Sequence, residues 1–215
     1  MAAGEVGDAG VQLEKRYLRP DGSTRWVWLA VAPVAGPGAQ RWTLATVHDV
    51  TDRRRTEDVL RTEAHTDPLT GLWNRRGWRR AMRQLLHREQ VEPVTIAMLD
   101  LDRFKVYNDV HGHGAGDALL QEFGARAQAA LRSDDVLARW GGEEFALALP
   151  RCGIGDAGTV LGLLARVVPD EQTFSAGYTT MRGGESVADT WDRADTLLYA
   201  AKRQGRDRAI TDITT

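Results

Sequence analysis

A continuous apolar run at residues 94–101, VTIAMLDL, restricts the possible folds of this chain more than any other feature. A strand buried on both faces reads as a nearly unbroken apolar run, whereas a half-solvated strand alternates apolar and polar residues. The run therefore predicts a central strand in a covered sheet. Two acids, Asp100 and Asp102, stand at its C-terminal end. Ligand sites commonly form at the C-terminal ends of such strands.

Helical patterns elsewhere in the chain provide the cover for this strand. Asn74 is predicted to cap a helix whose apolar stripe consists of Trp78, Met82, Leu85 and Leu86. Further helices are expected from Gly116 onward, at 157–168 and over 187–206. From residue 66 the predicted order is αβαββαβα. This order indicates an α/β (α+β) fold in which helices pack on a largely antiparallel sheet.

Residues 139–150, RWGGEEFALALP, are typical of a β-hairpin with apolar arms. The prediction places the two-residue loop at Gly141 and Gly142, because primed turns need a positive φ that glycine adopts easily. Glu143 and Glu144 then stand at the mouth of a buried hairpin. Hairpin formation does not require these two carboxylates, so they call for a functional explanation.

The acids at 100 and 102 and the glutamates at 143 and 144 could converge to hold hard cations. Mg²⁺ prefers carboxylate and carbonyl oxygens together with phosphates. Lys105 and the glycine-rich loop expected between Asn108 and Asp117 could face a polyphosphate. Each piece alone has an ordinary explanation, such as a solvated strand end. Together they favour metal-assisted phosphoryl chemistry.

Residues 66–212 resemble the GGDEF domain, the diguanylate cyclase that condenses two GTP into cyclic di-GMP and two pyrophosphates. The matching motifs run in family order: TDPLTGLWNRRG, DLDRFKVYND, GHGAGD, RWGGEEF, FSAGY and RADTLLYAAKRQGR. The turn motif Gly141, Gly142, Glu143, Glu144 and Phe145 has Glu-Glu where the family often has Asp-Glu, an accepted active variant. Asp207 departs from the usual Asn and is expected to be structural. The resemblance implies a homodimer with one GTP in each half-site.

The resemblance also implies roles for individual residues. Glu143 and Lys105 become the catalytic residues, and the metal ligands are Asp100, the Leu101 carbonyl oxygen and Glu143. Two Mg²⁺ ions are implied in each active site, with Mn²⁺ as an alternative. Adjacent strand residues point to opposite faces, so Glu143 and Glu144 are not expected to share an ion. Periodicity alone would nominate Asp102 beside Asp100, but the family does not use it, so Asp102 and Glu144 are left as neighbours of the ligands.

Substrate-binding residues follow from the same resemblance. Asn108 and Asp117 match the guanine readers, since a carboxylate can accept from guanine N1–H and N2–H together. The alternative for this pair is loop stabilisation. Lys105, Lys202 and Arg206 match the cations that face the phosphates in the family. Lys202 and Arg206 are expected at i, i+4 on one face of the last helix. The alternative role for these two is stabilisation of the helix C-terminus. The implied substrate-binding residues are Phe104, Lys105, Asn108, His113, Asp117, Lys202 and Arg206.

Arg132 and Asp135, in RSDD, match the RxxD product-inhibition site of the family at the family's spacing. An arginine can fork onto a phosphate or a guanine edge, and an aspartate can accept from guanine. The alternative is an ordinary turn between a helix and a strand. Cyclic di-GMP is therefore expected both as product and as inhibitor.

The N-terminal part predicts a separate, smaller structure. Residues 1–10 are expected to be disordered, and residues 11–51 resemble the last three strands of a PAS sensor domain. These strands form a short antiparallel β fragment, with an exposed edge that can pair with a second chain. Residues 52–65 are predicted to form a connector helix leading to the GGDEF domain at 66–212.

Composition narrows the remaining choices. The 215 residues carry a formal net charge of −2, so no nucleic-acid polymer is expected as a partner. No secretory signal and no apolar stretch of about 18 residues is visible, which predicts a cytoplasmic protein without a membrane segment. The single cysteine, Cys152, is expected to be buried. Two alternatives to an active cyclase stay open: an inactive GGDEF-type receptor for nucleotide or cyclic di-GMP, and a PAS-driven interaction protein.

Overall fold

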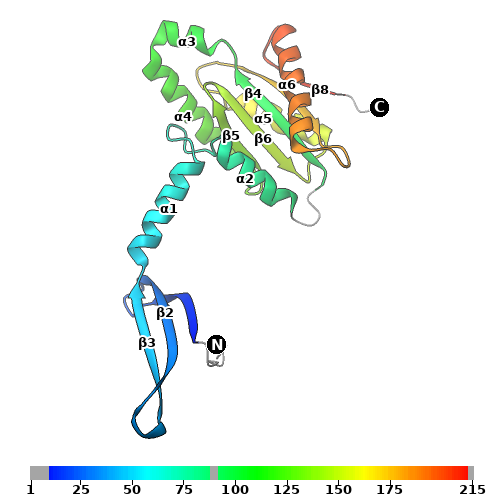
Figure 1. The fold of residues 1–215 in the computed structure, drawn as a ribbon. Helices are drawn as coiled ribbons and strands as arrows, with labels where there is room; N and C mark the ends of the chain where they lie inside the picture. Colours follow the sequence, from blue (N-terminus) through cyan, green and yellow to red (C-terminus); the bar gives the residue numbers. More distant parts are fainter. Residues whose placement is uncertain (1–9, 88–91, 213–215) are drawn as a thin grey trace. The chain divides into compact units, whose positions relative to one another are not determined.

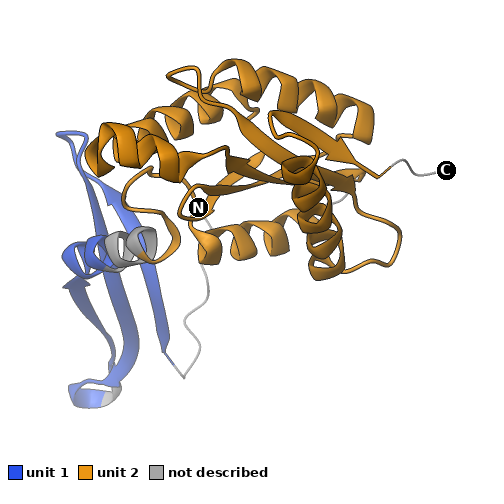
Figure 2. Cartoon of the chain, turned by 90° about the horizontal axis from the view of Figure 1, so that it is seen from above, with its two compact units in different colours: residues 1–62 blue, residues 63–215 orange. Residues whose placement is uncertain are grey.

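The computed structural model describes residues 10–87 and 92–212, without the side chains of residues 39 and 57–63. The chain divides into two compact units, Met1–Thr62 and Glu63–Thr215 (Figure 2). The predicted disordered N-terminus falls outside the described residues except for Gly10. No helix of the described residues is long and apolar enough to cross a membrane.

The first unit is a three-stranded antiparallel sheet in the order β1-β2-β3. The strands are β1 (Val11–Leu18), β2 (Thr24–Ala35) and β3 (Arg41–Asp49), which agree with the three antiparallel strands predicted over residues 11–51. Every residue of β3 is exposed. Helix α1 (Thr51–His65) follows, close to the predicted connector at 52–65.

The second unit is built on a five-stranded sheet in the order β5-β6-β4-β7-β8 (Figure 1). The pairs β5·β6, β6·β4 and β4·β7 are antiparallel, and only β7·β8 is parallel. All eight residues of β4 (Val94–Leu101) are buried, as predicted for the central strand. The other strands are β5 (Val136–Gly141), β6 (Glu144–Pro150), β7 (Phe174–Thr180) and β8 (Arg208–Thr211).

Helices cover both faces of this sheet and produce two hydrophobic clusters. One cluster places Phe123 of α4 (His113–Ala130) and Leu161 of α5 (Ile154–Arg166) against Leu99 of β4. The other places Trp78 of α2 (Arg75–Leu86) and Leu198 of α6 (Val187–Arg203) against Met98. The mostly antiparallel sheet with flanking helices is therefore confirmed. Asn74 caps α2 as predicted, accepting from the backbone N–H groups of Arg76 and Gly77, each at 2.9 Å.

Two predicted elements are wrong. The glycine-rich loop between Asn108 and Asp117 is largely helical, because α3 (Phe104–His111) and the start of α4 occupy it. Gly112, with φ +84°, is the break between the two helices. The last helix ends at Arg203 rather than at Arg206, and β8 follows, a strand that the sequence pattern did not predict.

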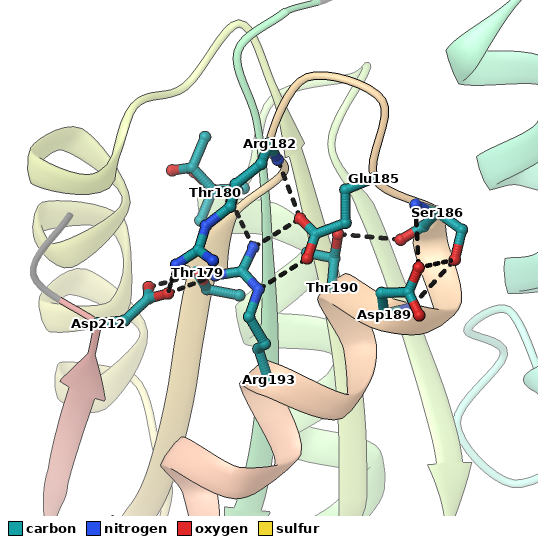
Figure 3. Close-up of polar contacts among 10 residues, drawn as sticks. Thr179, Thr180, Arg182, Glu185, Ser186, Asp189, Thr190, Arg193 and Asp212 are labelled. Atoms are coloured by element: carbon teal, nitrogen blue, oxygen red, sulfur yellow. Dashed lines mark hydrogen bonds and ion pairs between the residues drawn. The ribbon is translucent and has the colours of Figure 1, made fainter.

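A polar network around Arg193 fixes α6 to the end of β7 (Figure 3). The Arg193 guanidinium donates to the Glu185 carboxylate at 2.7 Å and to the Thr180 carbonyl oxygen at 2.9 Å. It also pairs with Asp212, which follows β8. These bonds set the position of the helix that carries Lys202.

Candidate active site at the C-terminal end of β4

The Asp100 carboxylate lies at the buried end of the central strand. Asp100 is 8% exposed, and one of its oxygens lies 2.6 Å from the Lys202 ammonium of α6. Burial raises the pKa of the Asp100 carboxyl, the Lys202 charge opposes this rise, and the charges of Glu143 and Glu144 add to it. Negative and positive groups thus meet where the sequence placed a ligand site.

The hairpin brings its glutamates to the same strand end, but the predicted loop is wrong by one residue. Gly141 pairs with Glu144, so the two-residue loop consists of Gly142 and Glu143. Gly142 has φ +53°, and a glycine at the first loop position is the requirement of a type II′ turn. Glu143 is therefore a turn residue, and the alternation argument does not apply to it. Glu144 pairs directly with Asp100 across β4 and β6.

Arg139 fixes this turn from the side. Its guanidinium donates to the Gly142 carbonyl oxygen at 2.8 Å and lies 3.1 Å from the Asp67 carboxylate. The two charged side chains are only 14% and 18% exposed. The pKa of Asp67 is lowered because hydrogen bonds from Thr70 and Arg139 outweigh its partial burial. Sequence reasoning did not single out either residue.

Asp102 is directed into the protein rather than toward the other acids. It is 5% exposed, and its carboxylate accepts from the Thr173 and Ser175 hydroxyls, each at 2.7 Å. It also accepts from the backbone N–H of Asp207 at 3.0 Å. These bonds use both oxygens of the Asp102 carboxylate.

Helices α3 and α4 bring the two predicted guanine readers to one place. Asn108 packs against the start of α4 so closely that a Cβ on Gly116 would lie 1.8 Å from its side-chain oxygen. That oxygen is buried and has no hydrogen-bond partner among the described residues. Asp117, which follows Gly116, is exposed, as are His113 and Lys105, whereas Phe104 is buried.

The predicted shared helix face of Lys202 and Arg206 is wrong. The glycine at 205 (φ +116°) follows the helix end, and Arg206 has φ +66° in the turn leading to β8. The backbone N–H of Arg206 donates to the Ala201 carbonyl oxygen at 3.1 Å, which closes this turn. Arg206 therefore lies in a turn, whereas Lys202 lies on the helix and pairs with Asp100.

A hollow of about 430 Å³ adjoins Arg206, and most of its lining was not nominated from the sequence. It lies between α3, the segment before β7 and the 205–207 turn. Tyr107 of α3 closes one side by donating its hydroxyl to Asp170 at 2.6 Å. An aromatic i, i+4 pair, Tyr107 and His111, was the available sequence signal; their rings lie 4.6 Å apart.

The donors at the strand end suit a magnesium ion that is shared with a substrate. Within the described ranges, no three His, Cys, Asp or Glu side chains group closely enough to hold a metal by themselves. Mg²⁺ is usually bound by one or two carboxylates plus substrate phosphates rather than by an all-protein cage. Asp100, Glu143 and the backbone carbonyl of Leu101 are hard oxygen donors of this kind.

Arg132 and Asp135 form the turn between α4 and β5. An Asp135 carboxylate oxygen accepts from the Arg132 backbone N–H at 2.8 Å, and burial raises the pKa of Asp135. The side chain of Arg132 is exposed. Cys152, with 5% exposure, is buried as expected.

Fold and site together define an α/β domain with several acids and the Lys202 ammonium at the end of its central strand. Residues 64–208 match the family described as "Diguanylate cyclase, GGDEF domain". This match covers more than half of the chain, and the chain belongs to the GGDEF family.

Relatives and solved structures agree with this assignment. The chain is 36% identical over 200 residues to "Diguanylate cyclase DgcM" of Escherichia coli K12, covering 88% of this chain and 48% of that protein. It thus spans about half the length of this curated relative. The coiled coil and GGDEF domain of DgcB from Caulobacter crescentus, solved with c-di-GMP, is 30% identical with a TM-score of 0.70, covering 76% of this chain and 93% of that one. The "active GGEEF domain" of a Vibrio cholerae diguanylate cyclase is 26% identical with a TM-score of 0.57, covering 65% and 94%.

Proposed function

We propose that this protein is an active diguanylate cyclase that condenses two GTP into cyclic di-GMP and two pyrophosphates. The observation that carries the proposal is the end of β4, where the buried Asp100 carboxylate meets Lys202, pairs across the sheet with Glu144 of β6 and feels the charge of the turn residue Glu143. An inactive receptor does not require this complete set of charged groups. The GGEEF turn is also the form named in the active Vibrio cholerae domain.

In the proposed reaction each domain holds one GTP, and two domains face each other as a homodimer. Each ribose 3′-hydroxyl attacks the α-phosphorus of the opposite GTP, the new P–O bond forms, and the bond to pyrophosphate breaks. Glu143 accepts the proton of the 3′-hydroxyl, while Lys105, Lys202 and Arg206 offset the charge of the phosphates. Asp100, the Leu101 carbonyl oxygen and Glu143 would hold two Mg²⁺ ions, or Mn²⁺. When bound, these ions lower the pKa of the 3′-hydroxyl and neutralise charge at phosphorus.

Guanine selection is assigned to Asn108 and Asp117, with Phe104 and His113 beside them. The side-chain oxygen of Asn108 is buried without a partner among the described residues, so Asn108 carries an unsatisfied acceptor, which a rotation of the side chain would present to a base N–H. Asp117 can accept two hydrogen bonds from guanine, and adenine would leave it unpaired. A site of this kind can reject the wrong base by roughly 10⁴-fold.

The N-terminal unit is proposed to be part of a PAS-type sensor. Its exposed β3 edge would pair with a second chain, and α1 would connect it to the catalytic domain. The cytoplasm, which supplies GTP, is the proposed location. Regulation by product is assigned to Arg132 and Asp135.

The proposal is tested by incubating the protein with GTP and Mg²⁺ and measuring cyclic di-GMP by chromatography. Glu143→Gln keeps the side-chain shape but removes the charge, so the rate should fall by about 10²- to 10⁴-fold. Glu122→Gln is the matched control, because Glu122 lies on the exposed face of α4 beside Arg126. Binding of GTP without any cyclic di-GMP would identify an inactive receptor instead. Normal turnover by Glu143→Gln would remove Glu143 from the reaction.

A further inference from the structure

The turn that carries Arg206 has an unfavourable backbone conformation. Arg206 and Asp207 are consecutive non-glycine residues with φ +66° and +48°, both in the left-handed region. L-residues adopt this region at a cost, so such a turn persists only where its surroundings hold it.

Three hydrogen bonds hold this turn: the Arg208 guanidinium donates to the Arg206 carbonyl oxygen at 2.9 Å, and two backbone N–H groups of the turn donate to its two sides. On the helix side, Arg206 N–H donates to the Ala201 carbonyl oxygen at 3.1 Å. On the sheet side, Asp207 N–H donates to the Asp102 carboxylate at 3.0 Å. An ionised acceptor makes the second bond stronger than a neutral one would.

Asp102 is itself firmly placed by the sheet. Its backbone N–H donates to the Thr173 carbonyl oxygen at 2.8 Å, and its carboxylate accepts from the Thr173 and Ser175 hydroxyls. Ser175 pairs with Asp100 in β4 on one side and with Arg208 in β8 on the other. The Arg206 turn is thus tied to the strand end that carries Asp100.

We infer that Asp102 is a positioning residue, which sets the Arg206 guanidinium where it contacts the triphosphate of GTP. The inference rests on the proposed function, since GTP binding is what gives Arg206 a phosphate to contact. Asp102 contributes through the Asp207 bond rather than by binding metal. Its effect on the substrate should therefore depend on the presence of the Arg206 side chain.

A double-mutant cycle tests this dependence. Binding is measured with a GTP analogue whose α–β bridging oxygen is replaced by methylene, which cannot release pyrophosphate. Asp102→Ala should weaken binding about tenfold, and Asp102→Asn about threefold, because the amide oxygen still accepts from Asp207 without its charge. In an Arg206→Ala background, either change at Asp102 should have little further effect. If the Asp102 substitutions weaken analogue binding by the same factor in the wild-type and Arg206→Ala backgrounds, the inference is overturned.

Hydrogen exchange gives a readout that does not require substrate. The amide of Asp207 should exchange faster in Asp102→Asn and fastest in Asp102→Ala, whereas Arg206→Ala should leave it protected. Thr95→Val is the structural control, because Thr95 is buried at the opposite end of β4 and donates to the Cys152 carbonyl oxygen at 2.7 Å. It should lower the melting temperature without changing the exchange of the Asp207 amide or the affinity for the analogue.

The outcomes separate this inference from the proposed function. Wild-type protein that binds the analogue but forms no cyclic di-GMP contradicts the cyclase proposal, and the cycle can still be measured. Wild-type protein that does not bind the analogue overturns both. Unchanged exchange of the Asp207 amide in Asp102→Ala overturns the positioning role by itself. If Asp102→Ala does not fold, the isosteric Asp102→Asn decides.

Discussion

At the scale of single residues, the position of Asn108 depends on the missing side chain of Gly116. A Cβ there would lie 1.8 Å from the Asn108 side-chain oxygen and 3.1 Å from the Phe104 ring. Gly116→Ala should therefore displace Asn108 and weaken GTP binding by about tenfold or more, which is about 1.4 kcal/mol. Titration of the variant with GTP and with ATP checks this prediction, since the affinity for ATP should change less than the affinity for GTP.

Gly114→Ala provides the control for this change. A Cβ on Gly114 meets nothing within 4 Å, and both glycines lie in the first turns of α4. Alanine stabilises a helix relative to glycine by roughly 0.5–1 kcal/mol. Gly114→Ala should thus leave GTP affinity unchanged and raise the melting temperature slightly. Equal affinity losses in the two variants would contradict the close-packing argument.

The sequence nominated Asn108 and Asp117 but not the contact that positions Asn108. The order of residue types in a motif is visible in a sequence, whereas the approach of α3 to α4 depends on the backbone at Gly112. Asp102 illustrates the same limit. Strand periodicity placed its side chain beside Asp100, but the chain leaves the strand after Leu101 and the carboxylate bonds to Thr173 and Ser175 instead.

At the scale of elements, the Arg139–Asp67 pair connects the segment before α2 to the signature hairpin. Breaking a buried ion pair by removing one partner costs about 3–5 kcal/mol. This pair is partly exposed, so a somewhat smaller effect is expected. Arg139→Gln should lower the free energy of unfolding by about 2–4 kcal/mol. It should also release the Gly142–Glu143 turn and reduce the rate of cyclic di-GMP formation. Denaturant unfolding and the chromatographic assay measure the two effects.

Arg126→Gln is the matched control for Arg139→Gln. Arg126 pairs with Glu122 on α4, and both side chains are 49% exposed. Surface pairs of this type are worth about 0–1 kcal/mol, so stability and rate should both stay near wild type. A similar loss of stability in the two variants would show that the hairpin does not depend on Asp67.

The elements themselves were predictable in proportion to their apolar pattern. The central strand carries an unbroken apolar run and the capped helix α2 carries an apolar stripe, and both were found, as were the three N-terminal strands. Helix α3 has a polar and aromatic sequence that resembles a loop, and β8 has only four residues. The glycine at 205 was a visible signal for the end of α6, since helices often end before a left-handed glycine. The pairing of Gly141 with Glu144 was not predicted, because it depends on the register of the whole hairpin.

The network at the start of α6 makes stability depend on pH (Figure 3). Hydrogen bonds from Arg193 lower the pKa of Glu185 from 4.5 to about 2. A lowered pKa in the folded state stabilises the fold above the unfolded pKa. This contribution should be lost as pH falls from about 4.5 toward 2. As pH falls through this range, the free energy of unfolding should decline less steeply in Glu185→Gln than in the wild type. Equal slopes in the two proteins would contradict the assignment to Glu185.

At the scale of the whole molecule, the two units differ in how they are stabilised. Residues 63–215 contain both hydrophobic clusters of the described chain. The three-stranded sheet instead leaves Trp42, Leu44 and Val47 of β3 exposed by 56–61%. An exposed apolar edge strand is a surface for pairing with another strand. The proposed pairing of two chains, on which a two-substrate reaction depends, can therefore start from this unit.

Control by product acts on the same two-chain assembly, and Arg132 offers a clean way to test it. The turn bonds at this site use the backbone of Arg132, whose N–H donates to Asp135 and whose carbonyl accepts from the Asp135 N–H at 3.2 Å. Arg132→Ala therefore keeps the turn and removes only the exposed guanidinium. Asp135→Ala would break the turn as well and would not separate the two roles.

The expected result is an unchanged initial rate with a changed time course. Cyclic di-GMP bound at Arg132 would hold two domains apart from their productive arrangement, so wild-type progress curves should flatten as product accumulates. Curves of Arg132→Ala should stay linear for longer, and direct titration should show weaker binding of cyclic di-GMP, by tenfold or more for a lost charged contact of about 1.5–3 kcal/mol. If both proteins flatten alike and bind cyclic di-GMP equally, Arg132 and Asp135 form a turn and not an inhibitory site.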